Sequence, residues 1–232
     1  MVRIDVDRPY GKEPPFRHVL SRVSSDSYLP KMEIFGYLSE LRILLSWLNQ
    51  RGARAYVFFR QCTFPSEATK RLIDQGGHEI GLHLENSRSY ETFMAEKKRL
   101  ETHIGRSVSS LSKHGSGGGR FGLCHHPPYQ PESYIEWAAR SRMKLFLGNL
   151  EDPRIPRMTS ANGLTVFRSA FWAEPSWRDT RAFPVEWLLS EARHRDVVLL
   201  VHPENILESP TLANDFLRII DALDTRIYNN GN

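Results

Sequence analysis

Cysteine is scarce in this sequence, which holds two such residues, Cys62 and Cys124, among its 232. They lie far apart and form no CxxC motif, so the pattern argues against a disulfide framework and against a cysteine-ligated zinc site. Reduced thiols in such small numbers are typical of cytoplasmic proteins. We therefore expect both cysteines to be reduced and the protein to be cytoplasmic.

Long hydrophobic runs are also missing. The most apolar stretch, Ile43–Leu48, is much shorter than the ~20 residues that cross a bilayer. The chain opens with a strand-like run, Val2–Val6, in place of the apolar region of a signal peptide. The sequence thus predicts no transmembrane segment and no export signal.

No block of like charge interrupts the chain, whose formal net charge is +4. Its 31 Lys and Arg residues are spread among 27 Asp and Glu residues, without the basic stripe that nucleic-acid binding requires. A hydrophobic content of 40% is typical of a globular protein. We exclude nucleic acid as a partner and expect one catalytic domain spanning residues 1–232, because α/β barrels reach this size as one unit.

Strand-like and helix-like segments alternate along the chain. In residues 31–50 apolar side chains recur every three or four positions, as in a helix, and Gly52 lies where a terminating glycine belongs. Runs such as Val197–Val201 are apolar throughout, as expected for strands covered on both faces. This alternation predicts a parallel sheet with right-handed crossovers. Strands are predicted at residues 2–6, 53–59, 78–84, 107–112, 144–147, 164–168 and 197–201, and helices at 31–50, 65–75, 87–103, 132–141, 185–194 and 212–223.

The count of about seven strand–helix units favours an α/β fold with a closed or nearly closed barrel of parallel strands. A doubly wound open sheet is the alternative. In either fold, functional groups gather at the carboxyl ends of the strands. Four predicted strands end in residue types that bind metals or transfer protons: Asp5-Val6-Asp7, His83-Leu84-Glu85, Lys113-His114 and His202-Pro203-Glu204.

Asp5 and Asp7 are two residues apart and face the same side of a strand. Two adjacent carboxylates repel each other, so a bound cation or a shared proton is expected between them. Loop-capping aspartates are the alternative interpretation. Burial of an unpaired carboxylate is costly, and a metal ion removes that cost, which favours the functional interpretation.

The segment Gly77–His83 contains two histidines but is not an HExxH motif, because the spacing is one residue too long. On a strand His78 and His83 face opposite sides, so one ion cannot easily hold both. His83, at the strand end, is the better ligand, and His78 is interpreted as structural. Glu85 lies on the same side as His83.

Residues 113–131 form a predicted loop rich in Gly, Pro and His. Residues 117–122 match GxGxxG, but the following residues 124–128, with two prolines, cannot begin the helix that a dinucleotide site needs. We exclude dinucleotide binding and interpret His125 and His126 as loop residues. His202, at the end of the most apolar strand, is interpreted as an acid–base residue.

The order Asp-x-Asp, Gly-His-Glu-Ile-Gly-x-His and late Leu-x-His resembles the NodB-type polysaccharide deacetylases, carbohydrate esterase family 4. The resemblance covers most of the chain, and Gly77–His83 is its most specific part. Residues 5–11, 81–87 and 112–117 resemble the divergent WbmS type, found with bacterial lipopolysaccharide O-antigen genes. The resemblance implies a distorted (β/α) barrel, a divalent metal for which zinc is expected, and hydrolysis of the N-acetyl group of an amino sugar.

Carried over residue by residue, the resemblance assigns Asp5 as the general base and His202 as the general acid. It assigns Asp7 and His83 as metal ligands. The family's second metal histidine lies four residues after the first, where this chain has Ser87. We expect His114 to be the third protein ligand, with Glu85 as the alternative.

The arginine of the family's third motif is not evident in this chain. Lys113 or Arg120 is expected to take its place in binding the substrate. Tyr129 and Trp172 are expected to offer flat faces to a sugar ring, with Trp177 and Phe171 as further candidates. The expected partner is an N-acetylated sugar or saccharide, free or carrier-linked.

Three other functions compete with this one. A non-catalytic, saccharide-binding member of the fold is supported by Ser87. A phosphoesterase on the same barrel is disfavoured because there is one cluster of candidate ligands and no second set. A scaffold protein is disfavoured because the polar residues gather at strand ends.

Overall fold

The computed structural model describes residues 1–7, 15–16, 19–20, 23, 38–120, 123–160 and 162–223. Its strands are β1 (Val2–Val6), β2 (Ala55–Phe59), β3 (Glu79–Leu84), β4 (Ser110–Lys113), β5 (Leu145–Leu150), β6 (Met158–Thr159), β7 (Thr165–Ser169), β8 (Phe171–Trp172) and β9 (Leu199–Val201). Its α-helices are α2 (Leu38–Gln50), α3 (Glu67–Gly76), α4 (Tyr90–Ile104), α5 (Pro131–Arg140), α6 (Val185–Glu191), α7 (Pro203–Glu208) and α8 (Pro210–Ala222). Two short 3-10 helices are η2 (Gln61–Thr63) and η3 (Pro175–Trp177).

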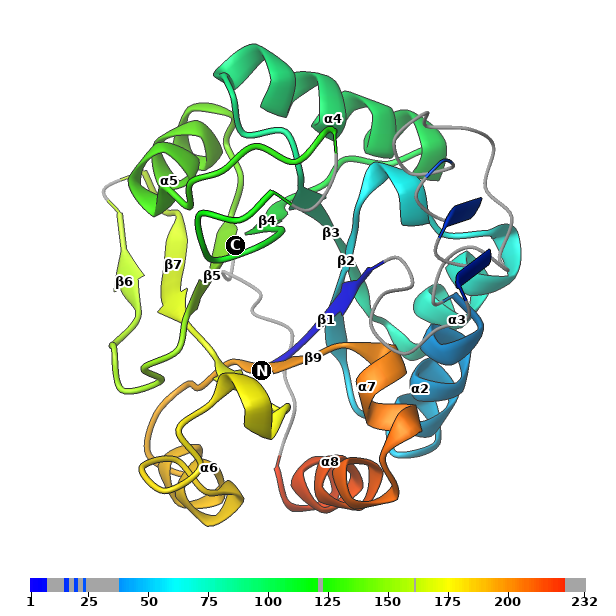
Figure 1. Cartoon of the computed structure of the whole chain (residues 1–232), viewed down its shortest axis with the longest axis vertical. Coiled ribbons are helices and arrows are strands. Elements are labelled where there is room, and N and C mark those ends of the chain that lie inside the picture. The colour runs from blue at the N-terminus through cyan, green and yellow to red at the C-terminus, as the bar shows by residue number, and fades with distance from the viewer. Residues whose placement is uncertain are drawn as a thin grey trace.

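The nine strands form one sheet in the order β6-β7-β5-β4-β3-β2-β1-β9-β8. Every pairing is parallel except that of β6 with β7. The sheet curls into a ring with the helices outside it (Figure 1). β7 pairs with β5 and β8 pairs with β9, yet Ala170 alone separates β7 from β8, so the chain itself joins the two sides of the curl. The predicted parallel α/β barrel is confirmed.

Strand alternation divides the barrel into two hydrophobic regions. In β1, Val2, Ile4 and Val6 belong to the large core between sheet and helices, whereas Arg3 and Asp5 lie between them in sequence and face the interior. A second, smaller group, which we call the interior cluster, fills the inside of the barrel. It consists of Tyr56, Phe58, Leu145, Leu147, Phe167, Ala170, Trp172, Val198 and Leu200.

Gly81 has a packing role in this interior. It occupies an inward position of β3, where a Cβ atom would collide with the ring of Phe58 and the hydroxyl of Ser110. The second glycine of the Gly-His-Glu-Ile-Gly-x-His segment therefore makes room for an aromatic side chain on β2.

The helix boundaries follow local capping rules. The Ser66 and Ser89 hydroxyls accept hydrogen bonds from the third residue of α3 and α4, and Gly77 ends α3 in a left-handed conformation. The predicted helix at 31–50 is present as Leu38–Gln50, and its residues 31–37 lie outside the described residues. Strands β6 and β8 were not predicted, because two residues give no periodic signal.

Two negative predictions can be compared with the structure. Cys62 and Cys124 remain thiols and form no disulfide with each other. Within the described part of the chain, no helix has both the length and the apolarity to traverse a bilayer.

Candidate metal centre

Three inward side chains converge at the carboxyl ends of β1, β3 and β4. Asp7 Oδ1 lies 3.1 Å from His114 Nδ1 and 3.8 Å from His83 Nε2. The two imidazole nitrogens are 3.3 Å apart. The triangle forms because β3 lies beside β4 in the sheet. Residues 7, 83 and 114 also continue the alternation that turns every second side chain of each strand into the barrel.

The size of this triangle can be compared with that of a metal site. Zinc bonds to His nitrogen and carboxylate oxygen at about 2.0–2.2 Å in tetrahedral geometry. Simple geometry then puts neighbouring ligand atoms about 3.3–3.6 Å apart. The three observed separations bracket that length, and two imidazoles with one carboxylate match the three-ligand sites that leave a fourth position open. Asp7, His83 and His114 therefore fit a divalent metal ion such as zinc.

The protonation states also suit a metal. Burial lowers the pKa of His83 well below its usual value and lowers that of His114, so both rings are neutral near pH 7. Burial alone would raise the pKa of Asp7, but the neighbouring His114 and Arg60 hold it well below the usual range. A carboxylate with two neutral imidazoles is the state that metal binding requires.

Both histidines are fixed by a second set of contacts. The Nδ1 atom of His83 is hydrogen-bonded to the Ser112 hydroxyl at 2.7 Å, which turns Nε2 toward Asp7. The His114 N–H donates to the carbonyl of Leu84 at 2.9 Å. The His114 carbonyl in turn accepts from His125 Nε2 at 3.0 Å. Such outer contacts orient ligands before the metal arrives.

Arg60, the residue directly after β2, also belongs to this site, although no sequence pattern pointed to it. Its guanidinium donates to Asp7 Oδ1 at 3.3 Å and to Glu85 Oε1. Glu85, the alternative ligand, is thus engaged with Arg60, while His114 completes the triangle. The pairing of Arg60 with carboxylates that follow the neighbouring strands could be predicted only if the strand order were known.

Asp5 lies beside the triangle, with its Oδ2 atom 3.6 Å from His83 Nε2. Its partner is Arg3, which is fully buried and donates to Asp5 Oδ1 at 2.9 Å and to Oδ2 at 2.6 Å. A bidentate pair of this kind fixes the plane of the carboxylate. Arg3 therefore supplies a buried arginine beside the candidate base.

The two residues expected to replace the family's arginine lie elsewhere. Lys113 is buried, and its ammonium donates to the His114 carbonyl at 2.6 Å. Burial lowers its pKa to about 7, against the opposing effect of Glu85. Arg120 is exposed and donates to the carbonyl of Leu123 at 2.7 Å.

His202 approaches the triangle from the end of β9. Its Nδ1 atom lies 2.8 Å from Glu174 Oε1, and its Nε2 atom faces Asp7 Oδ2 at 3.9 Å. Burial would lower the pKa of His202, but the charge of the Glu174 carboxylate raises it to about 10. His202 is therefore a cation at neutral pH.

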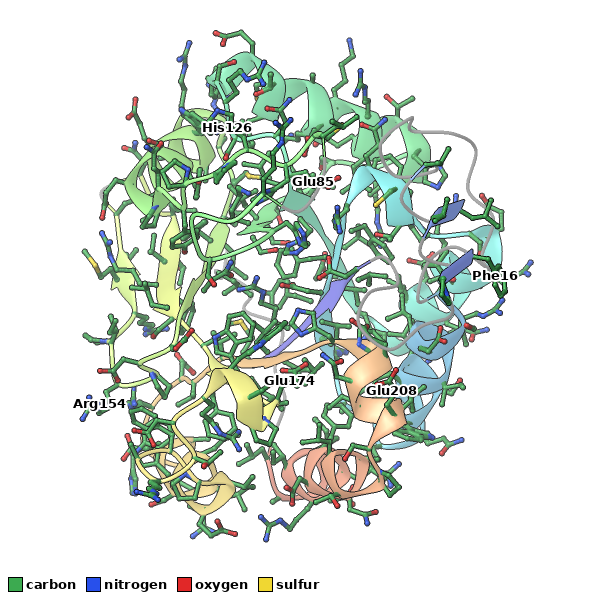
Figure 2. The ribbon with its side chains drawn as sticks, in the orientation of Figure 1. Phe16, Glu85, His126, Arg154, Glu174 and Glu208 are labelled. Atoms are coloured by element: carbon green, nitrogen blue, oxygen red, sulfur yellow. The ribbon has the colours of Figure 1, made fainter. Side chains whose placement is uncertain are left out.

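Glu174 is the carboxylate that sequence reasoning missed. It follows the two-residue strand β8, and its Oε1 also accepts from the His202 N–H and from Asn205 Nδ2, both at 3.1 Å. Glu174 and Glu85 lie on opposite sides of the ring of strands (Figure 2). The sequence did place Glu174 a few residues after the predicted strand at 164–168. The short strand β8 lies between that strand and Glu174, so Glu174 does not directly follow the end of the predicted strand.

The aromatic candidates divide by burial. Trp177 is 39% exposed and its ring centre is 5.5 Å from that of His202, whereas Trp172 is buried at 5.9 Å from His202. The Tyr129 hydroxyl accepts from the N–H of Asn149 at 3.0 Å. Phe171 faces the outer core. Of these four, Trp177 is the most exposed ring, and it lies beside His202.

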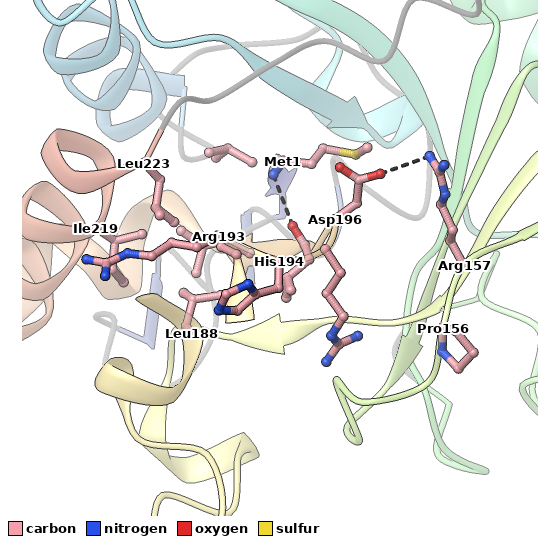
Figure 3. A pocket seen from close by; sticks show the side chains of 14 residues that line it. Met1, Pro156, Arg157, Leu188, Arg193, His194, Asp196, Ile219 and Leu223 are labelled. Carbon is pink, nitrogen blue, oxygen red and sulfur yellow. Dashed lines mark hydrogen bonds and ion pairs between the residues drawn. The ribbon is translucent and has the colours of Figure 1, made fainter. Parts of the chain in front are cut away.

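The amino end of the barrel contrasts with this site. His78 accepts from the N–H of Ala55 at 3.0 Å and contacts Asn49 Oδ1 at 2.7 Å, far from the metal triangle. A cavity of about 580 Å³ also lies at this end, where Arg157 pairs with Asp196 (Figure 3). It is lined by the amino ends of β1 and β9 and not by their carboxyl ends, so it is separate from the triangle.

No family model matches the chain, and no curated protein matches it. Solved structures with a related fold include a mutant of a CE4 family pseudoenzyme with restored enzymatic activity, at 12% identity and a TM-score of 0.43. That match covers 95% of this chain and 61% of the other, so this chain spans about three fifths of its length.

Two further structures carry the same family name. The Xyl-CE4 domain of a multidomain xylanase from the hindgut metagenome of Trinervitermes trinervoides is 12% identical, with coverage of 80% of this chain and 74% of that one and a TM-score of 0.39. A family 4 acetyl xylan esterase from Clostridium thermocellum, in complex with a cobalt ion, is 15% identical, with coverage of 94% and 80% and a TM-score of 0.42. At TM-scores below 0.5 these likenesses add no argument about activity, which rests on the residues of this chain.

Proposed function

We propose that this chain is a metal-dependent deacetylase that hydrolyses the N-acetyl group of an amino sugar. The substrate is proposed to belong to bacterial surface polysaccharide biosynthesis, as in the WbmS-like O-antigen branch, and the metal to be zinc. The observation that carries the proposal is the triangle of Asp7, His83 and His114, with a carboxylate on one side and a cationic histidine on the other.

Amide hydrolysis needs a base for the attacking water and an acid for the departing amine. A divalent ion held by Asp7, His83 and His114 would lower the pKa of water and polarise the acetyl carbonyl. Asp5 is oriented by Arg3 beside His83 and accepts the proton of the attacking water. As the carbon–nitrogen bond breaks, the protonated His202 donates its Nε2 proton to the departing amine. The products are acetate and the free amino sugar.

The pairing of His202 with Glu174 supports this division of labour. Because Nδ1 is held by Glu174, the donating Nε2 atom points into the site. The raised pKa keeps His202 protonated while the candidate ligand Asp7 is ionised. Hydrolysis that needs one group deprotonated and another protonated is expected to give a bell-shaped pH–rate profile.

The non-catalytic alternative depended on Ser87. In the structure the Ser87 hydroxyl donates to the carbonyl of His126 at 3.0 Å, and His114, from a neighbouring strand, lies 3.1 Å from Asp7 as a candidate third ligand. The departure from the family pattern at position 87 therefore leaves three candidate ligands in place.

The test is acetate release from N-acetylglucosamine, from its uridine diphosphate ester and from chitooligosaccharides, by protein stripped of metal and reloaded with zinc. Asp5→Asn and His83→Ala are expected to lose at least ~100-fold in activity. His194→Ala, an exposed histidine at the opposite end, should match wild type. Full activity of both site variants on a cleaved substrate would sink the proposal.

A further inference from the structure

Asn149 is a buried amide that neither the sequence patterns nor the proposed mechanism uses. It lies at the carboxyl end of β5 and is 3% exposed. Its Oδ1 atom accepts from Arg3 Nη2 at 2.8 Å, and its Nδ2 atom donates to the carbonyl of Lys113 at 2.6 Å and to that of Gly115 at 3.3 Å. The side chain therefore links β1 to the segment that follows β4, two elements that β2 and β3 separate in the sheet.

One side of this link holds the peptides that flank His114. Lys113 and Gly115 are the residues directly before and after His114. The Asn149 amide therefore hydrogen-bonds to the main chain on both sides of a candidate ligand. Gly115 has a positive φ of 75° and begins a glycine-rich turn. Glycine restricts the backbone least, so this turn gains much from an external anchor.

The other side of the link holds the candidate base. Arg3 forms the bidentate pair with Asp5, and its Nη1 atom donates to the carbonyls of Leu147 and Gly148 at 3.0 and 2.8 Å. The pairing of β5 with β7 shifts register between residues 147 and 150, where these carbonyls lie. Arg3 is thus fastened to β5 and to Asp5 together.

We propose that Asn149 is a positioning residue that sets His114 relative to Asp5, and so couples metal affinity to the orientation of the base. The inference rests on the proposed metal site and deepens it. Partners of this outer kind typically change metal affinity by about 10–100-fold. The contacts form a continuous path from Asp5 through Arg3 and Asn149 to the main chain at His114.

The variant Asn149→Asp breaks this path with little change in volume. One carboxylate oxygen still accepts from Arg3, but the other faces the two carbonyl oxygens that the amide held. Lone pairs then oppose lone pairs, so the turn at residues 113–115 is released. The new charge also competes with Asp5 for the Arg3 guanidinium.

A matched control exists at the opposite end of the barrel. Asn49 Nδ2 donates to the carbonyl of Leu72 at 3.1 Å, and its Oδ1 atom contacts His78 Nε2. Asn49→Asp therefore removes the same kind of hydrogen bond far from the metal triangle. A purely structural role of Asn149 predicts that the two variants behave alike.

The experiment titrates cobalt(II) into metal-free wild type, Asn149→Asp and Asn49→Asp, and records the dissociation constant, the visible absorption spectrum and the melting temperature. We expect Asn149→Asp to bind cobalt ~10–100-fold more weakly, with an altered spectrum. Asn49→Asp should keep the wild-type constant and spectrum even where its melting temperature falls. If Asn149→Asp does not fold, Asn149→Ala takes its place in the same titration.

The outcomes separate this inference from the function on which it rests. A wild-type protein that binds no cobalt overturns the metal site and the inference with it. Wild-type binding that His114→Ala abolishes, but that Asn149→Asp leaves within twofold, overturns the positioning role alone.

Discussion

The two ends of the barrel interior differ in the polarity of their side chains. Away from the carboxyl ends of the strands most inward side chains belong to the interior cluster, such as Phe58 and Leu200, and Arg3 on β1 is a charged member of the same layer. Two residues further along the same strands they become Arg60 and His202. This distance is about 6.6 Å. Apolar packing and the candidate metal site thus lie at different levels along the strand axis. Substitutions in the interior cluster should lower stability, whereas substitutions at the carboxyl ends should lower metal affinity and activity.

The largest effect is expected at the charged end. Asp7→Asn removes the anionic member of the proposed ligand set, so metal affinity should fall by more than the ~100-fold given for outer partners, and activity should be lost. Metal content after dialysis and acetate release measure both. Asp74→Asn, an exposed carboxylate paired with Arg106, is the control and should resemble wild type. About one equivalent of metal retained by Asp7→Asn would contradict the comparison.

At the apolar end the expected loss is in stability. Leu145→Ala should lower the free energy of unfolding by about 2–5 kcal/mol, because Leu145 is buried in the interior cluster. Urea unfolding measures it, and Leu150→Ala, at the half-exposed end of the same strand, should cost much less. In the folded fraction, metal affinity should stay within threefold of wild type. A large loss of affinity would mean that the two ends are not separable.

A pH-dependent effect should also arise at the apolar end. Burial lowers the pKa of His78 to about 4, whereas the unfolded value is ~6.5. The unfolded state therefore binds the proton first, so this contribution to stability is complete above pH ~6.5 and is lost as the pH falls toward 4. For a pKa lowered from 6.5 to about 4 it amounts to roughly 3 kcal/mol.

His78→Gln cannot be protonated, so urea unfolding of the metal-free variant between pH 7 and 4 should show a shallower loss of stability than wild type. The exposed His194→Gln is the control and should keep the wild-type slope. Equal slopes for His78→Gln and wild type would refute the assignment.

The smallest effect concerns the acid at the charged end. Glu174→Gln removes the charge that raises the pKa of His202, so the alkaline limb of the pH–rate profile should move to lower pH. Activity above neutral pH should fall by about tenfold or more, as expected for a general acid out of its protonated state. Glu186→Gln, on the surface, should leave the profile in place. An unmoved alkaline limb would show that His202 does not donate the proton.

Much of this comparison could be predicted from the sequence. The seven longer strands follow from apolar runs and alternation, and Asp7, His83 and His114 meet because parallel strands end at one edge. The roles of these residues, the sugar, the zinc ion and the single domain stay predictions.

The partners of these residues could not be predicted. Arg60, Arg3 and Asn149 act on residues of other strands, so their contacts depend on the strand order. From sequence alone, a charged residue within a strand, such as Arg3, is expected to be exposed to solvent. Only the structure shows that the barrel interior is polar enough to bury it. Glu174 follows a strand too short to give a periodic signal.

The absence of a Cβ atom at Gly81 should constrain the sequences of related proteins. Because the Phe58 ring fills the space in which a Cβ atom would lie, the two positions share one fixed volume. Any relative with a bulkier residue at the position of Gly81 should have a smaller one at that of Phe58. Such reciprocal variation would let homologues be aligned across β2 and β3 even where the ligand motif has diverged.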